Sequence, residues 1–323
     1  MNKYSSVIIG TGSYLPEKIL SNNDLAKFVD TNDEWIVSRT GINQRHIVAE
    51  GEATSDLAFK AAQKAIDAAK ISPNEIDLII VCTTTPDKSF PAVAVMVQSK
   101  LGIHNIPAFD LQAVCAGFIY GLTVADNFIK SGSAKTVLVI GAESMSKLVN
   151  WQDRNTCVLF GDGAGAVVLR AMDGDVHPGI ISCQIKADGA YEDILFTDGG
   201  VASTQTSGVI KMLGKDVFKH AVEKMSQTLL DLLQQTNYTK DDINWIIPHQ
   251  ANARILDAIA LRLDFPKEKM VMTLREQANT SAATIPLALD HQAKLGKLKS
   301  NDLIMLTALG GGLTWGGVIL RWL

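Results

Sequence analysis

The sequence predicts an α/β fold made of two copies of one unit, with two sheets flanking shared central helices. One observation is that apolar, β-rich runs such as 78–83 and 136–141 alternate with helix-like runs such as 54–70 and 116–130. This alternation is typical of buried, largely parallel strands joined by helices. The second observation is that both halves of the chain carry similar landmarks in the same order.

These landmarks recur at a nearly constant spacing. The stretches "ISPNEIDLIIVCTTTPD" (71–87) and "YTKDDINWIIPHQAN" (238–252) each carry Ser or Thr, an acid three residues later, and a strand-like run. The offsets are 167 residues from Ser72 to Thr239, 162 from Leu101 to Leu263, and 164 from Gly132 to Gly296. Any two α/β segments look somewhat alike, but three ordered landmarks favour duplication of a unit of about 160 residues.

The first and central elements follow from local pattern. "MNKYSSVIIGTGSYLP" predicts a strand that ends in a turn, and we expect no signal peptide because it has no long apolar core. No stretch approaches the roughly 20 apolar residues that span a bilayer. The helix 116–130 is apolar around most of its circumference, so it should lie buried between layers and stop near Ser131 and Gly132.

Composition narrows the class of protein. The 323 residues are 47% hydrophobic and 20% charged, which is enough for a large core and about two domains. The net charge of −4 argues against a general nucleic-acid binder, although a local basic face is compatible with it. The four cysteines form no CxxC pair, and no HExxH occurs, which favours a reducing cytoplasm and no structural zinc.

The duplication also predicts which polar residues meet. Cys115 stands in "QAVCAGF" just before a predicted helix, and an offset of 164 leads from it to Asn279 in "EQANTSAAT". An offset of 167 leads from Cys82 to His249 in "IIPHQAN", at the end of a predicted strand. If the halves pack about a pseudo-twofold axis, Cys115, His249 and Asn279 converge on one site.

A cysteine at a helix N-terminus suits nucleophilic catalysis, because unpaired N–H groups favour the thiolate. The alternative is a core cysteine, which is our interpretation of Cys82, Cys157 and Cys183 in their apolar surroundings. A lone histidine is more often structural, but His249 opens a polar cluster after a buried strand, a setting typical of sites. Asn279 alone would be a turn residue.

Three glycine-rich stretches have different interpretations. "GTGSYLP" (10–16) fails the dinucleotide fingerprint because Leu15 stands where a third glycine is needed. "GDGAGA" (161–166) precedes a strand and predicts a tight connection where backbones approach closely. "GGGLTWGG" (310–317) follows a strand, so its N–H groups could face an oxyanion.

With these motifs together, the sequence resembles the β-ketoacyl-acyl-carrier-protein synthase III family, initiating condensing enzymes of the thiolase superfamily. The matching stretches include "TNDEWIVSRTGINQRH", "QAVCAGFIYGL", "FGDGAGAVVL", "PHQANARI", "NTSAATIP" and "ALGGGLTWGG". The resemblance implies a thiolase-like, duplicated, five-layered αβαβα architecture. It implies an N-terminal half, 1–173, that carries the catalytic cysteine, and a C-terminal half, 174–323, that carries the histidine and asparagine.

The resemblance implies that Cys115 takes an acyl group from acyl-CoA, with the N–H groups of Cys115 and Gly311 as oxyanion hole. Malonyl-carrier protein then loses carbon dioxide, and His249 and Asn279 hydrogen-bond to its thioester oxygen. The products are 3-oxoacyl-carrier protein, CoA and CO2, at the start of type II fatty acid biosynthesis. Acyl-CoA is a substrate, so we expect no cofactor and no metal.

Further contacts follow from the same resemblance, and each residue could also be ordinary core or solvated surface. The implied CoA-binding residues are Thr31, Trp35, Arg39, Arg154, Gly214 and Asn252. The implied carrier-protein contacts are Lys219, Arg254 and Arg262. Phe90 matches a residue that closes the partner's acyl pocket in a homodimer. Leu309 and Leu313 stand where the family often has Phe.

Three alternatives follow. Leu309 lies beside the implied site, so branched or longer primers stay open beside the expected acetyl group. A related condensing or acyl-transfer enzyme of secondary metabolism would share this pattern. A non-catalytic acyl-binding scaffold is disfavoured by the intact Cys115, His249 and Asn279. We expect a cytoplasmic enzyme without nucleic-acid or membrane partners.

Overall fold

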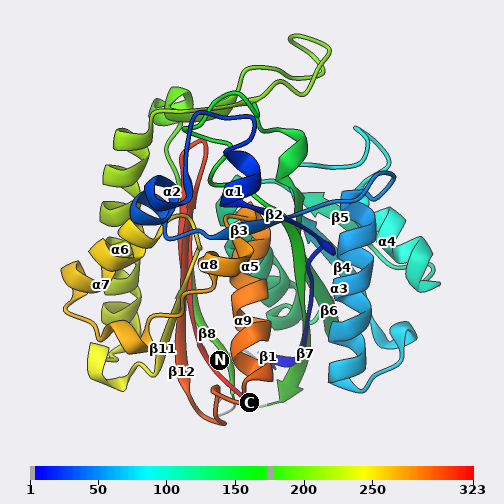
Figure 1. The fold of residues 1–323 in the computed structure, drawn as a ribbon. Helices are drawn as coiled ribbons and strands as arrows, with labels where there is room; N and C mark the ends of the chain where they lie inside the picture. Colours follow the sequence, from blue (N-terminus) through cyan, green and yellow to red (C-terminus); the bar gives the residue numbers. More distant parts are fainter. Residues whose placement is uncertain (1–3, 174–177) are drawn as a thin grey trace.

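The computed structural model describes residues 4–173 and 178–323, and two sheets form its frame (Figure 1). In spatial order, the first sheet contains β1 (Tyr4–Tyr14), β7 (Asp162–Asp173), β6 (Thr136–Ser144), β4 (Leu78–Cys82) and β5 (Ala108–Leu111). The second contains β8 (Gly179–Ala187), β13 (Thr314–Arg321), β12 (Leu303–Gly310) and β11 (Trp245–Pro248). The predicted strands at 78–83 and 136–141 are β4 and β6.

Helices complete five layers, which confirms the predicted αβαβα fold (Figure 1). Between the sheets lie α5 (Gly117–Lys130) and α9 (Thr284–Lys294). The outer face of the first sheet is covered by α3 (Thr54–Ala69) and α4 (Val93–Leu101), and that of the second by α6 (Gly214–Thr236) and α7 (Ala253–Leu263). The apolar faces of the central helices pack against both sheets, so burial of these faces joins the two halves.

Short elements surround one end of this frame (Figure 1). Two small hairpin-like pairs form there, each of two antiparallel strands. The strands and helices are β2 (Lys18–Ser21), β3 (Gln44–Ile47), β9 (Leu195–Thr197), β10 (Ile210–Met212), α1 (Asn22–Leu25), α2 (Asp33–Thr40) and α8 (Leu274–Gln277).

The two sheets repeat one pairing pattern. Starting from β1 or from β8, successive neighbours pair antiparallel, antiparallel and then parallel. The fifth strand of the second sheet is reduced to one parallel bridge between Ile246 and Met270. On the basis of this repetition we propose that the chain consists of two halves, 1–173 and 174–323. The second half begins with residues 174–177, which lie outside the described residues.

Two glycine-rich stretches serve close packing. Gly10 and Gly12 of β1 lie against α3, and a Cβ at Gly12 would overlap the backbone of Ala61 and Ala65. We expected the stretch "GDGAGA" to be a tight connection between elements. This was wrong, because β7 already begins at Asp162. The expected close approach is present, since a Cβ at Gly165 would lie 2.6 Å from the backbone nitrogen of Leu287.

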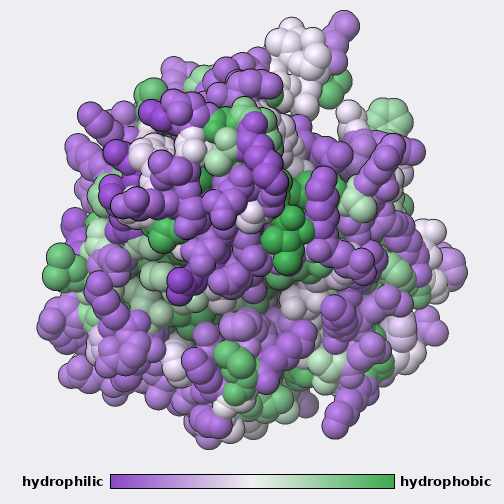
Figure 2. Space-filling model, in the orientation of Figure 1, coloured by the Kyte–Doolittle hydropathy of each residue, from purple (hydrophilic) through white to green (hydrophobic). Residues whose placement is uncertain are grey.

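The outer surface is mixed in character. The face drawn in Figure 2 is mostly hydrophilic, with small separate hydrophobic patches. Within the described residues, none of the helices combines the length and apolar character needed to cross a membrane.

The close contact of β1 with α3 predicts that Gly12→Ala lowers the free energy of unfolding by about 1–3 kcal/mol, because helix backbone cannot rotate away from the added methyl. Urea denaturation measures this change. Gly189→Ala is the matched control, since a Cβ at Gly189 meets no atom within 4 Å. Equal stability of the two variants would contradict the packing role of Gly12.

Candidate active site

One cavity of about 1650 Å³ receives all three residues of the predicted trio. Cys115, His249 and Asn279 line it together, although they are distant in sequence and come from different halves. The structure therefore places the three predicted residues on the wall of the same cavity. Leu309 and Gly311 line the same cavity.

Cys115 lies in a short 3-10 turn, Val114–Ala116, that leads directly into α5. Its side chain is nearly enclosed, with 5% of its surface exposed. Burial, with a smaller contribution from the nearby Glu143 carboxyl, raises the pKa of the thiol to about 12. The position before the helix was expected to favour the thiolate, and desolvation of the buried thiol acts in the opposite direction.

The end of β12 lies against the Cys115 turn. A Cβ at Gly310 would stand 2.7 Å from the backbone nitrogen of Cys115, so only glycine permits this approach. The Thr314 hydroxyl donates to the carbonyl of Ala113 at 2.8 Å, and its oxygen also lies 3.2 Å from the carbonyl of Gly311. These contacts hold the glycine-rich turn beside the cysteine, where backbone N–H groups can face a developing oxyanion.

His249 follows the last residue of β11 and is 2% exposed. Its backbone N–H donates to Thr307 of β12 at 2.8 Å, and its Nδ1 lies 2.7 Å from the Thr284 hydroxyl at the start of α9. Burial lowers the pKa of the imidazole to about 3, so the ring is neutral at physiological pH.

Asn279 is held by its backbone and by its side chain. Its N–H donates to Leu159 at 2.9 Å and its carbonyl accepts from Gly161 at 3.0 Å. Its Oδ1 accepts the N–H of Ser281 at 2.9 Å. Because this bond occupies the acceptor side of the amide, the Nδ2 hydrogens stay available as neutral donors toward the cavity.

The structural repeat corrects one step of the sequence argument. The turn Val114–Ala116 has its counterpart in Ser281–Ala283, at an offset of 167, and both turns begin with a residue of positive φ: Val114 at 48° and Ser281 at 49°. The counterpart of Cys115 is therefore Ala282 and not Asn279. Asn279 nevertheless reaches the cavity, because the segment before the turn also passes along its wall.

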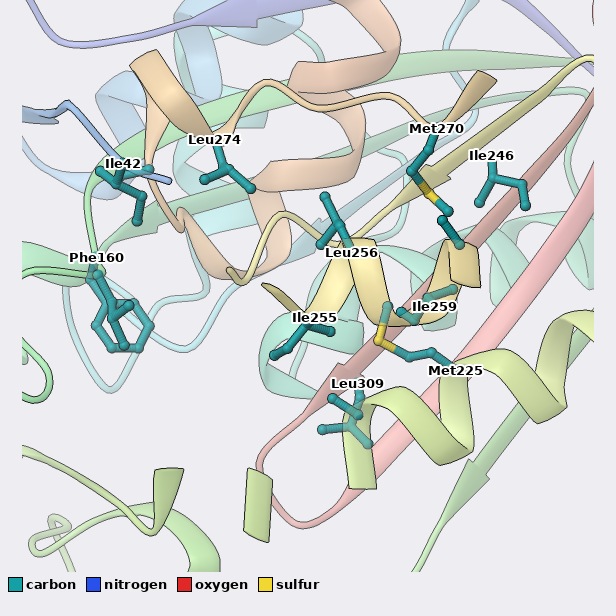
Figure 3. Packing of buried hydrophobic residues seen from close by; sticks show 14 of the residues in the cluster. Ile42, Phe160, Met225, Ile246, Ile255, Leu256, Ile259, Met270, Leu274 and Leu309 are labelled. Atoms are coloured by element: carbon teal, nitrogen blue, oxygen red, sulfur yellow. The ribbon is translucent and has the colours of Figure 1, made fainter. Parts of the chain in front are cut away.

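The wall around Leu309 is apolar. Leu309, Ile255 and Met225 line the cavity and belong to one hydrophobic cluster (Figure 3). Figure 3 shows Leu309 near Met225 of α6 and below Ile255 of α7. An acyl chain near Leu309 would thus meet aliphatic side chains.

Trp35 and two arginines form a cluster on the cavity lining. The guanidinium carbons of Arg39 and Arg154 lie 4.9 Å and 5.1 Å from the centre of the Trp35 ring. Arg154 also donates to the carbonyl of Asp30 at 3.0 Å. A planar base can enter between Trp35 and Arg154 only if the exposed Arg154 side chain moves outward.

The other predicted binding residues divide into two groups. Gly214, Asn252 and Arg254 line the cavity. The remaining four do not line it: Thr31, Phe90, Lys219 and Arg262. Lys219, Arg254 and Arg262 are exposed, as a docking surface requires, and Phe90 is 84% exposed.

Sequence reasoning missed two residues beside the trio, Thr284 and Glu143. Glu143 is fully buried in the region where β4 and β6 end, and it accepts the Thr85 hydroxyl at 2.7 Å and the Thr84 N–H at 3.1 Å. Burial raises the pKa of its carboxyl. An acid directly after the apolar run of β6, matched by three threonines after β4, was the available signal.

Within the described ranges, no group of three or more His, Cys, Asp or Glu side chains is arranged to hold a metal ion. The trio itself offers one thiol, one neutral imidazole and one carboxamide. Such a set suits nucleophilic acyl transfer next to neutral hydrogen-bond donors.

Comparison with known proteins agrees with this chemistry. Residues 109–189 match the family model described as 3-Oxoacyl-[acyl-carrier-protein (ACP)] synthase III, and residues 233–322 match the model of its C-terminal part. The β-ketoacyl-[acyl-carrier-protein] synthase III of Wolbachia pipientis is 57% identical over 100% of both chains. That of Ehrlichia canis is 55% identical over 98% of this chain and 99% of its own.

Solved structures agree as well. The 3-oxoacyl-[acyl-carrier-protein] synthase III from Aquifex aeolicus superposes with a TM-score of 0.93 at 48% identity, covering 98% of this chain and 100% of its own. The priming β-ketosynthase from the R1128 polyketide biosynthetic pathway gives a TM-score of 0.93 at 32% identity, covering 99% and 97%. The chain therefore belongs to the β-ketoacyl-[acyl-carrier-protein] synthase III family, as its motifs predicted.

Proposed function

We propose that this protein starts type II fatty acid synthesis by condensing an acyl-CoA primer with malonyl-carrier protein. The products are 3-oxoacyl-carrier protein, CoA and CO2, and acetyl-CoA is the proposed primer. The observation that carries the proposal is the meeting of Cys115, His249 and Asn279 on one largely apolar cavity.

In the first stage the Cys115 sulfur attacks the thioester carbonyl of acyl-CoA. The N–H groups of Cys115 and Gly311 stabilise the oxyanion, which fits the close approach of the β12 turn to the cysteine. The new bond joins Cys115 Sγ to the acyl carbon, CoA leaves, and the thiol proton goes to the departing sulfur. Since burial raises the pKa of the thiol to about 12, a base must remove that proton during attack.

In the second stage malonyl-carrier protein loses CO2 and the resulting enolate attacks acyl-Cys115. Asn279 donates to the enolate oxygen through Nδ2, and His249 donates through Nε2 after it takes up a proton. That proton is the one the overall reaction consumes, because neutral CO2 departs and the Cys115 thiolate is then protonated again. The proton therefore passes from His249 to Cys115 at the end of the cycle.

The binding partners belong to the same proposal. Trp35 and Arg154 would enclose the adenine of CoA, with Arg39, Gly214 and Asn252 along the tunnel. Thr31, which the family resemblance also implied, does not line the cavity. The exposed cations Lys219, Arg254 and Arg262 would contact the carrier protein. We propose a homodimer, in which the exposed Phe90 closes the acyl pocket of the partner, and a cytoplasmic location without cofactor or metal.

A second candidate is a priming condensation in polyketide synthesis. The fold similarity to the R1128 priming β-ketosynthase favours it, and Leu309 shapes the pocket where a different primer would lie. Preference for acetyl-CoA supports fatty acid initiation with an acetyl primer, and preference for a longer or branched acyl-CoA is compatible with both candidates. Dependence on the malonyl-carrier protein of fatty acid synthesis then separates them.

Replacing the nucleophile tests the central step. Cys115→Ala should form no acyl adduct with acyl-CoA and should reduce condensation to background, as measured by intact and peptide mass spectrometry. Cys157→Ala is the matched control, because Cys157 is buried but does not line the cavity. Full condensation by Cys115→Ala would refute the mechanism.

Asn279→Asp separates the two stages. Asp keeps an acceptor for the Ser281 N–H but loses the Nδ2 donor. Acylation of Cys115 should stay within about threefold, while condensation should fall about 10²–10³-fold, the usual cost of one oxyanion donor. Rapid-quench assays of each stage measure this, and equal losses in both stages would contradict the assigned role.

Trp35→Ala should raise the KM for acyl-CoA about tenfold, because stacking and cation–π contacts with the adenine are worth roughly 1–2 kcal/mol. The same variant should use an acyl-pantetheine thioester, which has no adenine, as well as the unsubstituted enzyme does. Steady-state kinetics with both donors measure the difference. A matching KM increase for the pantetheine thioester would contradict the assignment.

A further inference from the structure

The imidazole of His249 belongs to a short hydrogen-bond chain at the start of α9. Its Nδ1 lies 2.7 Å from the Thr284 hydroxyl, and that hydroxyl donates to the carbonyl of Ser281 at 3.0 Å. Both His249 and Thr284 are 2% exposed, so water does not compete for these bonds. The carbonyl of Ser281 accepts the backbone N–H of Thr284 as well.

The direction of these bonds determines where the ring proton lies. A hydroxyl has a single hydrogen, and a carbonyl oxygen can only accept. If the Thr284 hydrogen pointed to His249, two oxygens would face each other at 3.0 Å without a hydrogen between them. Both contacts are hydrogen bonds only when Nδ1 of His249 carries the proton and Thr284 passes its own hydrogen to Ser281.

We infer that Thr284 is a positioning residue that holds the proton of His249 on Nδ1 and so leaves Nε2 unprotonated in the resting enzyme. The inference rests on the proposed role of His249. Since the ring is neutral, Nε2 is then the base that the buried Cys115 thiol requires. As the Cys115 Sγ–acyl bond forms and the acyl–CoA bond breaks, Nε2 takes the thiol proton and gives it to the departing CoA sulfur.

The same bond also serves the second stage. An imidazolium has hydrogens on both nitrogens, so Nδ1 continues to donate to Thr284 after Nε2 takes up a proton. Thr284 therefore needs no rearrangement between the stages. One acceptor fixes the ring orientation when Nε2 acts as base and again when Nε2 donates to the enolate oxygen.

The other half of the molecule shows that this contact comes from the repeated backbone. At the offset of 167, His249 corresponds to Cys82 and Thr284 to Gly117. A Cβ at Gly117 would lie 3.3 Å from the Cβ of Cys82, so strand end and helix start meet in both halves. Only the half that holds the histidine has a hydroxyl at this contact.

The test compares Thr284→Val with Thr284→Ser. Valine keeps the shape of threonine and loses the hydroxyl acceptor, whereas serine keeps the hydroxyl acceptor. In ¹⁵N-histidine NMR spectra, the unsubstituted enzyme should give an unprotonated Nε2 signal, assigned by its absence from His249→Gln. In Thr284→Val the ring proton should lie on Nε2 in part or in full. Acylation of Cys115 should then be about tenfold slower, with unchanged KM for acyl-CoA. Thr284→Ser should keep the signal and stay within about threefold.

Thr228→Val is the matched control, because the Thr228 hydroxyl makes a similar bond to a helix carbonyl, at 2.8 Å, outside the cavity lining. Slower acylation in Thr284→Val with an unchanged Nε2 signal would make its role merely structural and overturn the inference. A protonated Nε2 in the unsubstituted resting enzyme would overturn it without any variant. Failure of the proposed function is distinct, since it would appear as absence of acyl-Cys115 in the unsubstituted enzyme.

Discussion

The packing of α5 and α9 between the two sheets, with the short turns at their starts in contact, is the constraint on which the active site depends. Each central helix begins with a short 3-10 turn, and the two turns meet where a Cβ at Gly117 would touch Ala282. Cys115 lies on one turn, and Asn279 lies two residues before the other. A change that separated the two turns would therefore move the nucleophile away from the donor that serves its partner substrate, without altering either side chain.

Burial then decides the chemical state of the site. Enclosure raises the pKa of the Cys115 thiol and lowers the pKa of the His249 imidazole, so burial favours the neutral form of each group. A neutral pair makes the proton a participant in acyl transfer, in contrast to a preformed thiolate. It also gives the hydrogen bonds around His249 more weight, because they decide which ring nitrogen faces the substrate.

The sequence was sufficient for the architecture and for placing Cys115, His249 and Asn279 on one cavity, because alternation and a repeated spacing survive in residue order. The repeat located His249 through Cys82, whose strand ends at the equivalent place. The sequence argument reached Asn279 with an offset of 164, whereas the structural repeat has an offset of 167. Spacing alone cannot show which residue near a turn faces a cavity. The position of Cys115 before a helix is visible in the sequence, whereas the desolvation that raises the pKa of its thiol is not. Thr284 was missed for a related reason: its role depends on the direction of one hydroxyl bond.

The contact between Cys82 and Gly117 determines how the two halves tolerate mutation. Cys82 is fully buried, and its neighbour has no side chain, so size alone limits what either position can hold. The equivalent positions 249 and 284 are limited by proton donors and acceptors. The duplicated fold thus contains the same contact twice. At the first contact the volume of the side chains is limited, and at the second the pattern of proton donors and acceptors is limited. In a library of random variants, small apolar exchanges should survive at the first contact, whereas at the second an isosteric exchange such as Thr284→Val should fold normally and yet react more slowly.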